Sequence, residues 1–291
     1  MNTHLEAAVT IARSAGELLR KAYAKTSHVD RKGVIDLVTD ADHASEALII
    51  KALRSRFADH GIVAEESGAD ADRGEYRWVV DPLDGTVNFA HKQPHFSVLI
   101  ALQHQNKRGE WHTELSTTYD PLRDELFVAE RGKGARLNDK RINVSKTVRL
   151  IDSLLVTGFA YDRLFVEHDN HGEFCRMNLL SQGVRRLGSA GLDLAYVACG
   201  RFDGFWEGHL NTWDLAAGAL LVTEAGGKVT DREGSAKVDD GRVILATNGA
   251  IHEVMREALI DASNHPTGSR NGLDKFLPKE VVPRVYFGPK S

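Results

Sequence analysis

The stretch Asp81-Pro82-Leu83-Asp84-Gly85-Thr86, entered from the apolar run Trp78-Val79-Val80, places two acids, a glycine and a hydroxyl directly after a predicted strand. Proline has a fixed φ and no N–H for a sheet ladder, so we expect the strand to turn at Pro82 and to bring both carboxylates to one side. Gly85 would let an oxyanion approach the backbone closely. A helix starting at about Thr86 would offer free N–H groups and a dipole that favours an anion. The stretch therefore indicates a site for a metal ion and a phosphate group, although an ordinary acidic turn with a helix cap uses the same residues.

Composition narrows the class of protein. The 291 residues, 42% of them hydrophobic and 27% charged, are enough to bury a sizeable core in one large domain or two. The net charge of -4 argues against a general nucleic-acid surface. No apolar run approaches the roughly 20 residues that span a bilayer. Residues 1–20 form an amphipathic pattern and not a signal peptide, so we expect a cytoplasmic protein without a membrane partner. Cys175 and Cys199 are interpreted as reduced thiols of no chemical role.

The predicted elements change in character along the chain. Apolar residues at helical spacing predict helices over 5–19 and 41–57, with a polar, basic loop over 27–35 between them. Short strands follow, and turn compositions between the later ones predict an antiparallel meander. Beyond residue 150 strands and helices alternate. The predicted strands are 62–64, 77–80, 96–103, 114–119, 126–129, 154–157, 202–206 and 243–246, and the later helices are 172–181, 189–198, 212–225 and 250–262. The tail 264–291 holds four of the seven prolines and no clear period, and no function is assigned to it.

Four acids follow predicted strands or open a predicted helix: Glu65, Asp81, Asp84 and Asp214. Open α/β sheets place their sites at these positions. Two like charges about 4 Å apart repel by roughly 4 kcal/mol at an effective dielectric near 20, so clustered carboxylates would need cations to stay ionised. Because neither His nor Cys stands among them, Mg²⁺ is preferred over Zn²⁺. Each acid taken alone could instead be a solvated loop residue or a first-turn helix acid.

Several segments together resemble the inositol monophosphatase family of Mg²⁺-dependent, lithium-sensitive phosphatases. The segments stand in the family's order and are Ala64–Gly68, Trp78–Phe89 and Trp213–Gly218, with further similarity at Asp36–Asp42 and Gly188–Ala195. The resemblance runs from the first helix to about Ala262. It implies an α/β (α+β) fold, a layered α-β-α-β-α sandwich of the sugar-phosphatase type, usually in a homodimer. Residues 1–263 would form a single catalytic domain with subdomains of roughly 1–150 and 151–263, and the tail 264–291 lies outside.

The resemblance implies a metal centre with two or three Mg²⁺ ions. The family pattern puts the carboxylates of Glu65, Asp81, Asp84 and Asp214 on the metals, with the backbone carbonyl of Leu83 as a further ligand. Lys32 lies in the loop that helps to hold the catalytic metal in relatives.

The resemblance also assigns catalytic and substrate-binding roles. Thr86 would orient the attacking water, and Asp42 would hold the Thr86 hydroxyl. Glu65 is the third residue to which the resemblance gives a catalytic role. Asp42 also stands in the helix-start pattern Thr39-x-x-Asp42, and one residue could serve both purposes. The N–H groups of Gly85 and Thr86 would bind phosphate oxygens. The predicted substrate-binding set is Asp84, Gly85, Thr86, Arg185, Ala190, Glu207 and Asp214, in which Glu207 would hydrogen-bond substrate hydroxyls and Arg185 could equally be a structural or dimer-face charge.

The predicted activity is hydrolysis of myo-inositol 1-phosphate and similar polyol monophosphates by metal-activated water. Val87 and Gly191 depart from residues frequent in the family, and neither departure removes a ligand. The same metal core in relatives cleaves fructose 1,6-bisphosphate, 3'-phosphoadenosine phosphates or histidinol phosphate, so these substrates stay open. Aspartyl-phosphate phosphatases are disfavoured because their loop acids are two apart, whereas Asp81 and Asp84 are three apart. Some bacterial members bind the transcription elongation machinery, which leaves a non-catalytic role as an alternative.

Overall fold

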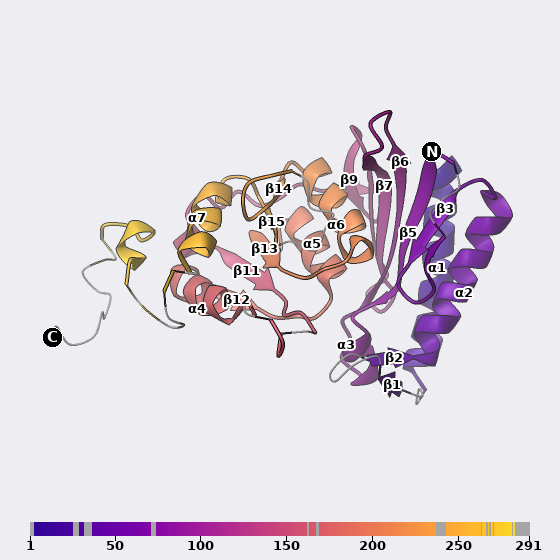
Figure 1. The fold of residues 1–291 in the computed structure, drawn as a ribbon, viewed down its shortest axis with the longest axis horizontal. Helices are drawn as coiled ribbons and strands as arrows, with labels where there is room; N and C mark the ends of the chain where they lie inside the picture. The colour runs from indigo at the N-terminus through magenta and orange to yellow at the C-terminus, as the bar shows by residue number, and fades with distance from the viewer. Residues whose placement is uncertain are drawn as a thin grey trace.

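Five layers of helices and sheets make up the fold, and Figure 1 shows them edge-on. The computed structural model describes residues 3–25, 29–31, 37–70, 74–161, 163–166, 169–236, 243–262, 264, 265, 267, 269, 271–280 and 282. In order across the molecule come a helix pair, a large sheet, a second helix pair, a smaller sheet and a third helix pair. The expected α-β-α-β-α sandwich is confirmed.

The large sheet has eight strands in the order β10-β9-β8-β7-β6-β5-β3-β4. The predicted antiparallel meander corresponds to β6, β7 and β8, and the structure extends it to β5 on one side and, on the other, to β9 and β10, which were not predicted. Strand β3 runs parallel to β5. The strands are β3 (Gly61–Ala64), β4 (Gly68–Asp70), β5 (Tyr76–Asp84), β6 (Ser97–Gln105), β7 (Trp111–Asp120), β8 (Glu125–Glu130), β9 (Gly134–Leu137) and β10 (Lys140–Arg141).

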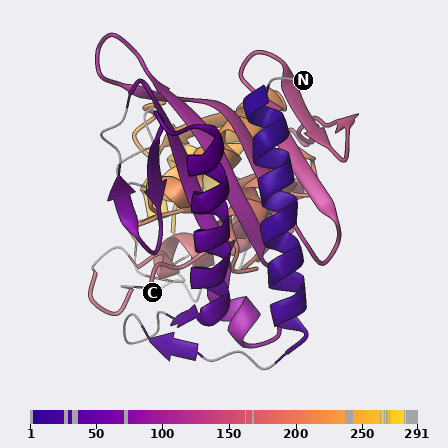
Figure 2. The same cartoon turned by 90° about the vertical axis from the view of Figure 1, so that its right-hand side faces the viewer.

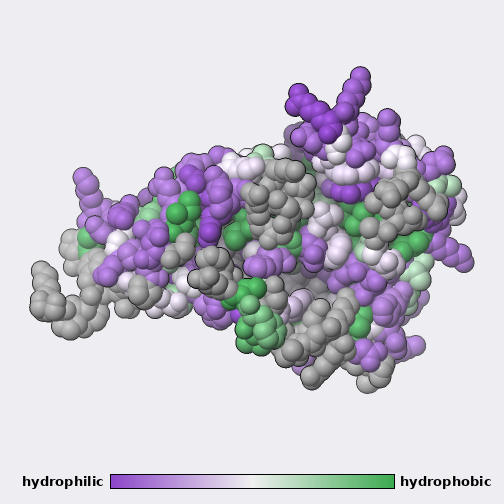
Figure 3. All heavy atoms as spheres, in the orientation of Figure 1, coloured by the Kyte–Doolittle hydropathy of each residue, from purple (hydrophilic) through white to green (hydrophobic). Residues whose placement is uncertain are grey.

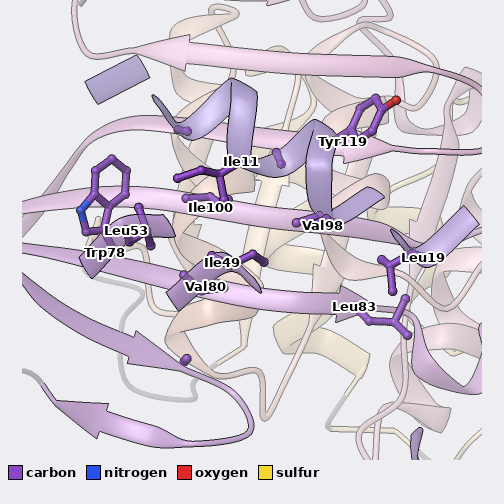
Figure 4. Packing of buried hydrophobic residues seen from close by; sticks show 14 of the residues in the cluster. Ile11, Leu19, Ile49, Leu53, Trp78, Val80, Leu83, Val98, Ile100 and Tyr119 are labelled. Carbon is purple, nitrogen blue, oxygen red and sulfur yellow. The ribbon is translucent and has the colours of Figure 1, made fainter. Parts of the chain in front are cut away.

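Helices α1 (Thr3–Tyr23) and α2 (Asp40–Arg56) lie side by side across one face of this sheet (Figure 2). Apolar side chains at helical spacing line their inner faces, including Ile11 of α1 and Ile49 of α2. Figure 4 shows these side chains packed against Trp78 and Ile100 of the sheet. Both helices were predicted from this spacing, and the polar face of each one is left to the surface.

Helices α5 (Ala190–Ala198) and α6 (Thr212–Glu224) fill the layer between the two sheets. A helix packed on both sides is apolar nearly all round, and every residue of α5 after Ala190 is buried. The two helices pack closely because Gly218 has no side chain: a Cβ there would lie 2.4 Å from Cδ1 of Leu194.

The smaller sheet has the strand order β12-β11-β13-β15-β14 and is covered on its outer face by α4 and α7. Its elements are β11 (Leu154–Thr157), α4 (His171–Leu180), β12 (Gly183–Arg185), β13 (Gly204–Glu207), β14 (Lys228–Asp231), β15 (Ile244–Thr247) and α7 (His252–Ala262). The remaining elements are β1 (Val29–Arg31), β2 (Leu37–Thr39), α3 (Thr86–Ala90), η1 (Leu150–Asp152) and η2 (Leu273–Lys275).

Two predictions need correction. The segment 27–35, expected to be a loop, contains the strand β1, which pairs antiparallel with β2. The strand that leads into the acidic stretch does not end before Pro82 but continues as β5 to Asp84.

None of the helices in the described part of the chain is long and apolar enough to cross a membrane. On the face seen in Figure 3, hydrophilic residues predominate, and apolar ones occur in small separate groups.

Candidate active site

A β-bulge in β5 places both acids of the opening stretch at one site. Asp81 pairs with Leu99 of β6, whereas Asp84 pairs with Ser97, so three steps along β5 match two along β6. In a regular strand two residues three apart point to opposite faces, and one extra residue reverses that relation. The two carboxylates therefore converge as predicted, but a bulge within the strand achieves this instead of the predicted turn at Pro82.

Asp84 is fixed by groups from two other elements. Its Oδ2 accepts hydrogen bonds from Ser97 Oγ at 2.8 Å, from the Gly191 N–H at 3.0 Å and from Ser189 Oγ. Burial raises the pKa of the Asp84 carboxyl, and the hydrogen bonds from the two serines oppose that rise. These bonds hold one oxygen, so the second oxygen can serve as a ligand.

Asp81 and Asp214 are held in a similar way. Oδ1 of Asp81 accepts from the N–H of Leu83 at 3.0 Å, and Oδ2 of Asp214 accepts from the N–H of Asn211 at 2.7 Å in a capping box at the start of α6. Burial and the neighbouring charges of Glu65, Asp84 and Asp214 raise the pKa of Asp81 well above its usual range. The pKa of Asp214 is raised to about 8, first by burial of its carboxyl and then by Glu65 and Asp84.

Thr86 and Asp42 form a buried pair. Oγ1 of Thr86 lies 2.9 Å from Oδ1 of Asp42 and 3.0 Å from the carbonyl oxygen of Leu83, both within hydrogen-bonding distance. The other oxygen of Asp42 accepts from the N–H and hydroxyl of Thr39 at 2.8 and 2.5 Å, which caps α2. Asp42 therefore caps a helix and holds Thr86 at once, and both contacts expected from the sequence are present.

Gly85 has a left-handed backbone with φ of 95° at the start of α3. A Cβ at this position would lie 3.1 Å from the carbonyl oxygen of His95 and 3.2 Å from that of Gly188. Both the backbone conformation and the close contacts favour glycine. The loop can thus pack tightly against the segment that leads into α5.

These residues line one pocket of about 150 Å³ between the two halves of the molecule. Its walls come from the β5 stretch, the turn after β3, the start of α5, the end of β13 and the start of α6. The predicted residues on its wall are Glu65, Asp81, Leu83, Asp84, Gly85, Thr86, Ala190, Glu207 and Asp214. Asp42 lies behind this wall, where it contacts Thr86.

Comparison with known proteins agrees with this geometry. A model of the inositol monophosphatase family matches residues 1–264. The chain belongs to the inositol monophosphatase family. An inositol-1-monophosphatase of Synechocystis is 46% identical over 263 residues, which cover 89% of each chain. The Nus factor SuhB of Haemophilus influenzae is 41% identical over 88% of this chain and 96% of its own length. A solved inositol monophosphatase structure from Anabaena superposes with a TM-score of 0.81 and 44% identity, covering 91% of this chain and 97% of that one.

Membership of the inositol monophosphatase family identifies the chain as a phosphatase enzyme. The family is metal-dependent in general. The acidic side chains on the pocket wall offer oxygen atoms, which are the donors that a hard cation prefers. Among the residues that the structure describes, no group of three or more Asp, Glu, His or Cys side chains is already placed to hold a metal ion by itself. Mg²⁺ does not require such a group, because it keeps several waters and uses one or two carboxylates together with substrate phosphate. The raised pKa values of Asp81 and Asp214 also fit a site completed by positive charge.

One residue suggested by the family resemblance lies elsewhere, and another is not described. Arg185 ends β12 with an exposed side chain and is not part of the pocket wall, whereas its neighbour Arg186 is. The pair Arg185-Arg186 was visible in the sequence, but only the fold decides which of the two faces the pocket. Lys32 lies outside the described residues.

Glu207 lies in a narrow gap. A Cβ on Gly158 would lie only 2.1 Å from both carboxyl oxygens of Glu207, so only glycine leaves room for this side chain. Burial, followed by the charges of Asp193 and Asp214, raises the pKa of Glu207 well above its usual range, and Arg186 opposes that rise. Sequence reasoning found Glu207 but not the gap that Gly158 provides.

Proposed function

We propose that this phosphatase is a Mg²⁺-dependent phosphomonoesterase that hydrolyses myo-inositol 1-phosphate and similar polyol monophosphates. The observation that carries the proposal is the Thr86–Asp42 pair in a pocket walled by Glu65, Asp81 and Asp84. A hydroxyl held by a buried carboxylate and placed beside several acids fits metal-assisted hydrolysis better than it fits an aspartyl-phosphate mechanism.

The proposed ligands are Glu65, Asp81, Asp84, Asp214 and the carbonyl of Leu83. When bound, Mg²⁺ supplies positive charge that stabilises the phosphate and acidifies a water molecule. We propose two or three ions per site and inhibition by lithium.

Thr86 is proposed to position the attacking water. A hydroxyl has one hydrogen and two lone pairs, so a Thr86 that donates to Asp42 can accept a hydrogen bond from that water. Asp42 also accepts from Thr39, which limits its rotation and keeps Thr86 oriented. The water is thereby aimed at phosphorus at little entropic cost during the reaction.

The substrate class rests on Glu207 and Arg186. The buried Glu207 carboxyl is proposed to hydrogen-bond a ring hydroxyl, and Ala190 gives the ring a small neighbour. Arg185 stays a substrate-binding proposal that the pocket lining does not support, because its side chain is exposed at the end of β12. The Gly85 and Thr86 N–H groups are proposed to bind phosphate oxygens.

The test is phosphate release from myo-inositol 1-phosphate by chelator-stripped protein, with and without Mg²⁺. Fructose 1,6-bisphosphate and 3'-phosphoadenosine 5'-phosphate are assayed in parallel. Strong Mg²⁺-dependent release from the inositol ester supports the proposal. Release from another ester alone would keep the metal chemistry and change the substrate, and no release from any ester would refute the proposal.

A second candidate function is contact with the transcription machinery, favoured by the relatives called Nus factor SuhB. We propose that the protein acts in the cytoplasm as a homodimer. Residues 1–263 would be one catalytic domain of two subdomains, with the tail 264–291 outside it. Cell growth supported by an Asp84→Asn protein would favour the non-catalytic role, and light scattering of the purified protein tests the dimer.

A further inference from the structure

Three polar side chains share the inner face of α2 near its start: Asp42, Ser45 and Glu46. Positions i, i+3 and i+4 lie on one side of a helix. All three are buried, with 0%, 0% and 4% of their surface exposed. Farther along the same face the buried residues are the apolar Ile49 and Leu53, which pack on the sheet.

The three side chains contact two segments of the candidate active site, the stretch from Asp81 to Thr86 and the turn after β3. Asp42 holds Thr86, as described above. The Ser45 hydroxyl donates to the carbonyl oxygen of Pro82 at 2.8 Å. Oε2 of Glu46 accepts from the backbone N–H of Glu66 at 2.8 Å.

The contact of Ser45 bears on the β-bulge. Pro82 lies inside the irregular stretch of β5, between Asp81 and Asp84, where the regular pairing with β6 is interrupted. A buried carbonyl without a donor is costly, and Ser45 supplies that donor from the helix. The hydroxyl therefore stabilises the backbone form that turns both carboxylates toward the pocket.

The contact of Glu46 bears on the turn after β3. Glu66 directly follows Glu65, the acid that this turn contributes to the pocket wall. The N–H that donates to Glu46 belongs to the peptide group that joins Glu65 to Glu66. The hydrogen bond therefore fixes the plane of this peptide group, which contains the Cα atom that carries the Glu65 side chain.

Attachment of α2 to the sheet does not by itself explain these polar groups. Burying a carboxyl group is unfavourable compared with burying an apolar side chain, and the apolar residues that follow already dock the helix. A buried acid and hydroxyl aimed at two backbone groups that flank the pocket acids indicate a role at the site.

We propose that Ser45 and Glu46 are positioning residues for metal binding, and that α2 acts as a rigid template that fixes the β5 bulge and the Glu65 turn relative to each other. This inference rests on the proposed function for the presence of a metal, but it concerns different residues. Partners one step removed from a metal ligand typically change metal affinity by about 10- to 100-fold when they are lost.

The test is isothermal titration of Mg²⁺ into chelator-stripped protein. Glu46→Ala and Ser45→Ala should each weaken Mg²⁺ binding by about 10-fold or more. Glu46→Gln should bind nearly as the parent does, because an amide oxygen can still accept the Glu66 N–H. Ser55→Ala at the exposed end of α2 and Glu257→Gln on the exposed face of α7 are the matched controls and should leave binding unchanged.

Two further readouts separate positioning from general stability. Circular dichroism and thermal unfolding without Mg²⁺ identify any variant that fails to fold. If Glu46→Ala fails to fold, the smaller change Ser45→Ala still tests the proposal. In phosphate release, the Mg²⁺ concentration for half-maximal rate should rise, while KM for myo-inositol 1-phosphate at saturating Mg²⁺ stays unchanged. Folded Ser45→Ala and Glu46→Ala proteins that bind Mg²⁺ as the parent does would overturn the inference, as would equal losses in Glu46→Gln and Glu46→Ala. A parent protein that binds no Mg²⁺ would instead refute the proposed function.

Discussion

Replacing Asp84 by Asn should change stability and activity in opposite directions. Oδ2 of Asp84 accepts three hydrogen bonds, from Ser97, Ser189 and the Gly191 N–H. In the Asn variant the amide oxygen can take this position, because an NH₂ group there would face three donors. The NH₂ group then occupies the place of the second carboxyl oxygen, and it cannot bind a cation.

The expected magnitudes follow from the electrostatics of the ion-free site. Burial outweighs the hydrogen bonds to Asp84 and raises the pKa of its carboxyl, so the ionised carboxylate is less favourable in the ion-free folded protein than in the unfolded chain. Each unit of such a shift is worth about 1.4 kcal/mol, so the neutral Asn should leave the ion-free protein at least as stable as the parent. Magnesium at 100 times its Kd stabilises a folded protein by about 2.7 kcal/mol. At about 2–4 °C per kcal/mol, the parent should gain about 5–10 °C in Tm, and the variant should gain little.

The assay combines thermal unfolding with and without Mg²⁺ and phosphate release at saturating Mg²⁺. Turnover of the Asp84→Asn protein should fall by about 10³-fold, since charge stabilisation of this kind is often the largest part of catalysis. A folded variant that hydrolyses substrate at the parent's rate would refute the assignment of Asp84. An ion-free variant several degrees less stable than the parent would refute the electrostatic argument.

Three further substitutions test separate parts of the molecule. Thr86→Val removes the hydroxyl that Asp42 holds and should lower kcat by about 10²-fold, whereas Thr86→Ser keeps a hydroxyl and should keep most of the parent's kcat. Equal losses of kcat in both variants would contradict the role of the hydroxyl. Glu207→Ala should raise KM for myo-inositol 1-phosphate by about tenfold, as expected for one lost hydrogen bond to a buried group, without changing KM for p-nitrophenyl phosphate, which has no ring hydroxyls. Burial lowers the pKa of His252 from 6.5 to about 4. Between pH 6.5 and pH 4 the unfolded chain therefore binds more protons than the folded protein, and the free energy of unfolding should fall as the pH drops through this range. His252→Gln should flatten that dependence in urea titrations, and an unchanged slope would refute the attribution.

The long elements could be predicted because each carries its own periodic pattern. The spacing of apolar residues in α1 and α2 reports burial against a sheet directly, and the alternation of turn residues separates the strands of the meander. Strands such as β1, β12 and β14 were missed because they are short and contain charged or polar residues, whereas the equally short β3, β11 and β15 consist mainly of apolar residues.

In the candidate site too, local motifs could be predicted from the sequence and long-range contacts could not. The acids were found because they lie in short, dense motifs. The groups that hold Asp84 were not found, since Ser97, Ser189 and Gly191 stand 13, 105 and 107 positions away from it. The bulge in β5 also depends on how β5 pairs with β6. Pro82 suggests an irregularity in the strand, but the sequence does not define which residues of β6 pair on either side of it.

Gly191 illustrates what a departure from family residues can mean. It lies in the first turn of α5 as a buried residue, and its N–H donates a hydrogen bond to Oδ2 of Asp84. A Cβ at this position would lie 2.4 Å from Cδ2 of Leu99 and 2.9 Å from Oδ2 of Asp84. The glycine therefore permits close packing, and the residue is fixed by its contacts.

Each acid that is fixed in the pocket has one carboxyl oxygen bound by the protein itself: Asp81 by Leu83, Asp84 by three donors and Asp214 by Asn211. Such hydrogen bonds stabilise the charged form, yet burial still raises the pKa of all three carboxyl groups. The arrangement is thus unfavourable for an isolated protein and consistent with a site selected for binding a cation. Because the donors come from helices, strands and their ends, the directions of the remaining oxygens are set in the ion-free protein. Under the proposed function this would reduce the reorganisation that ion binding and catalysis require.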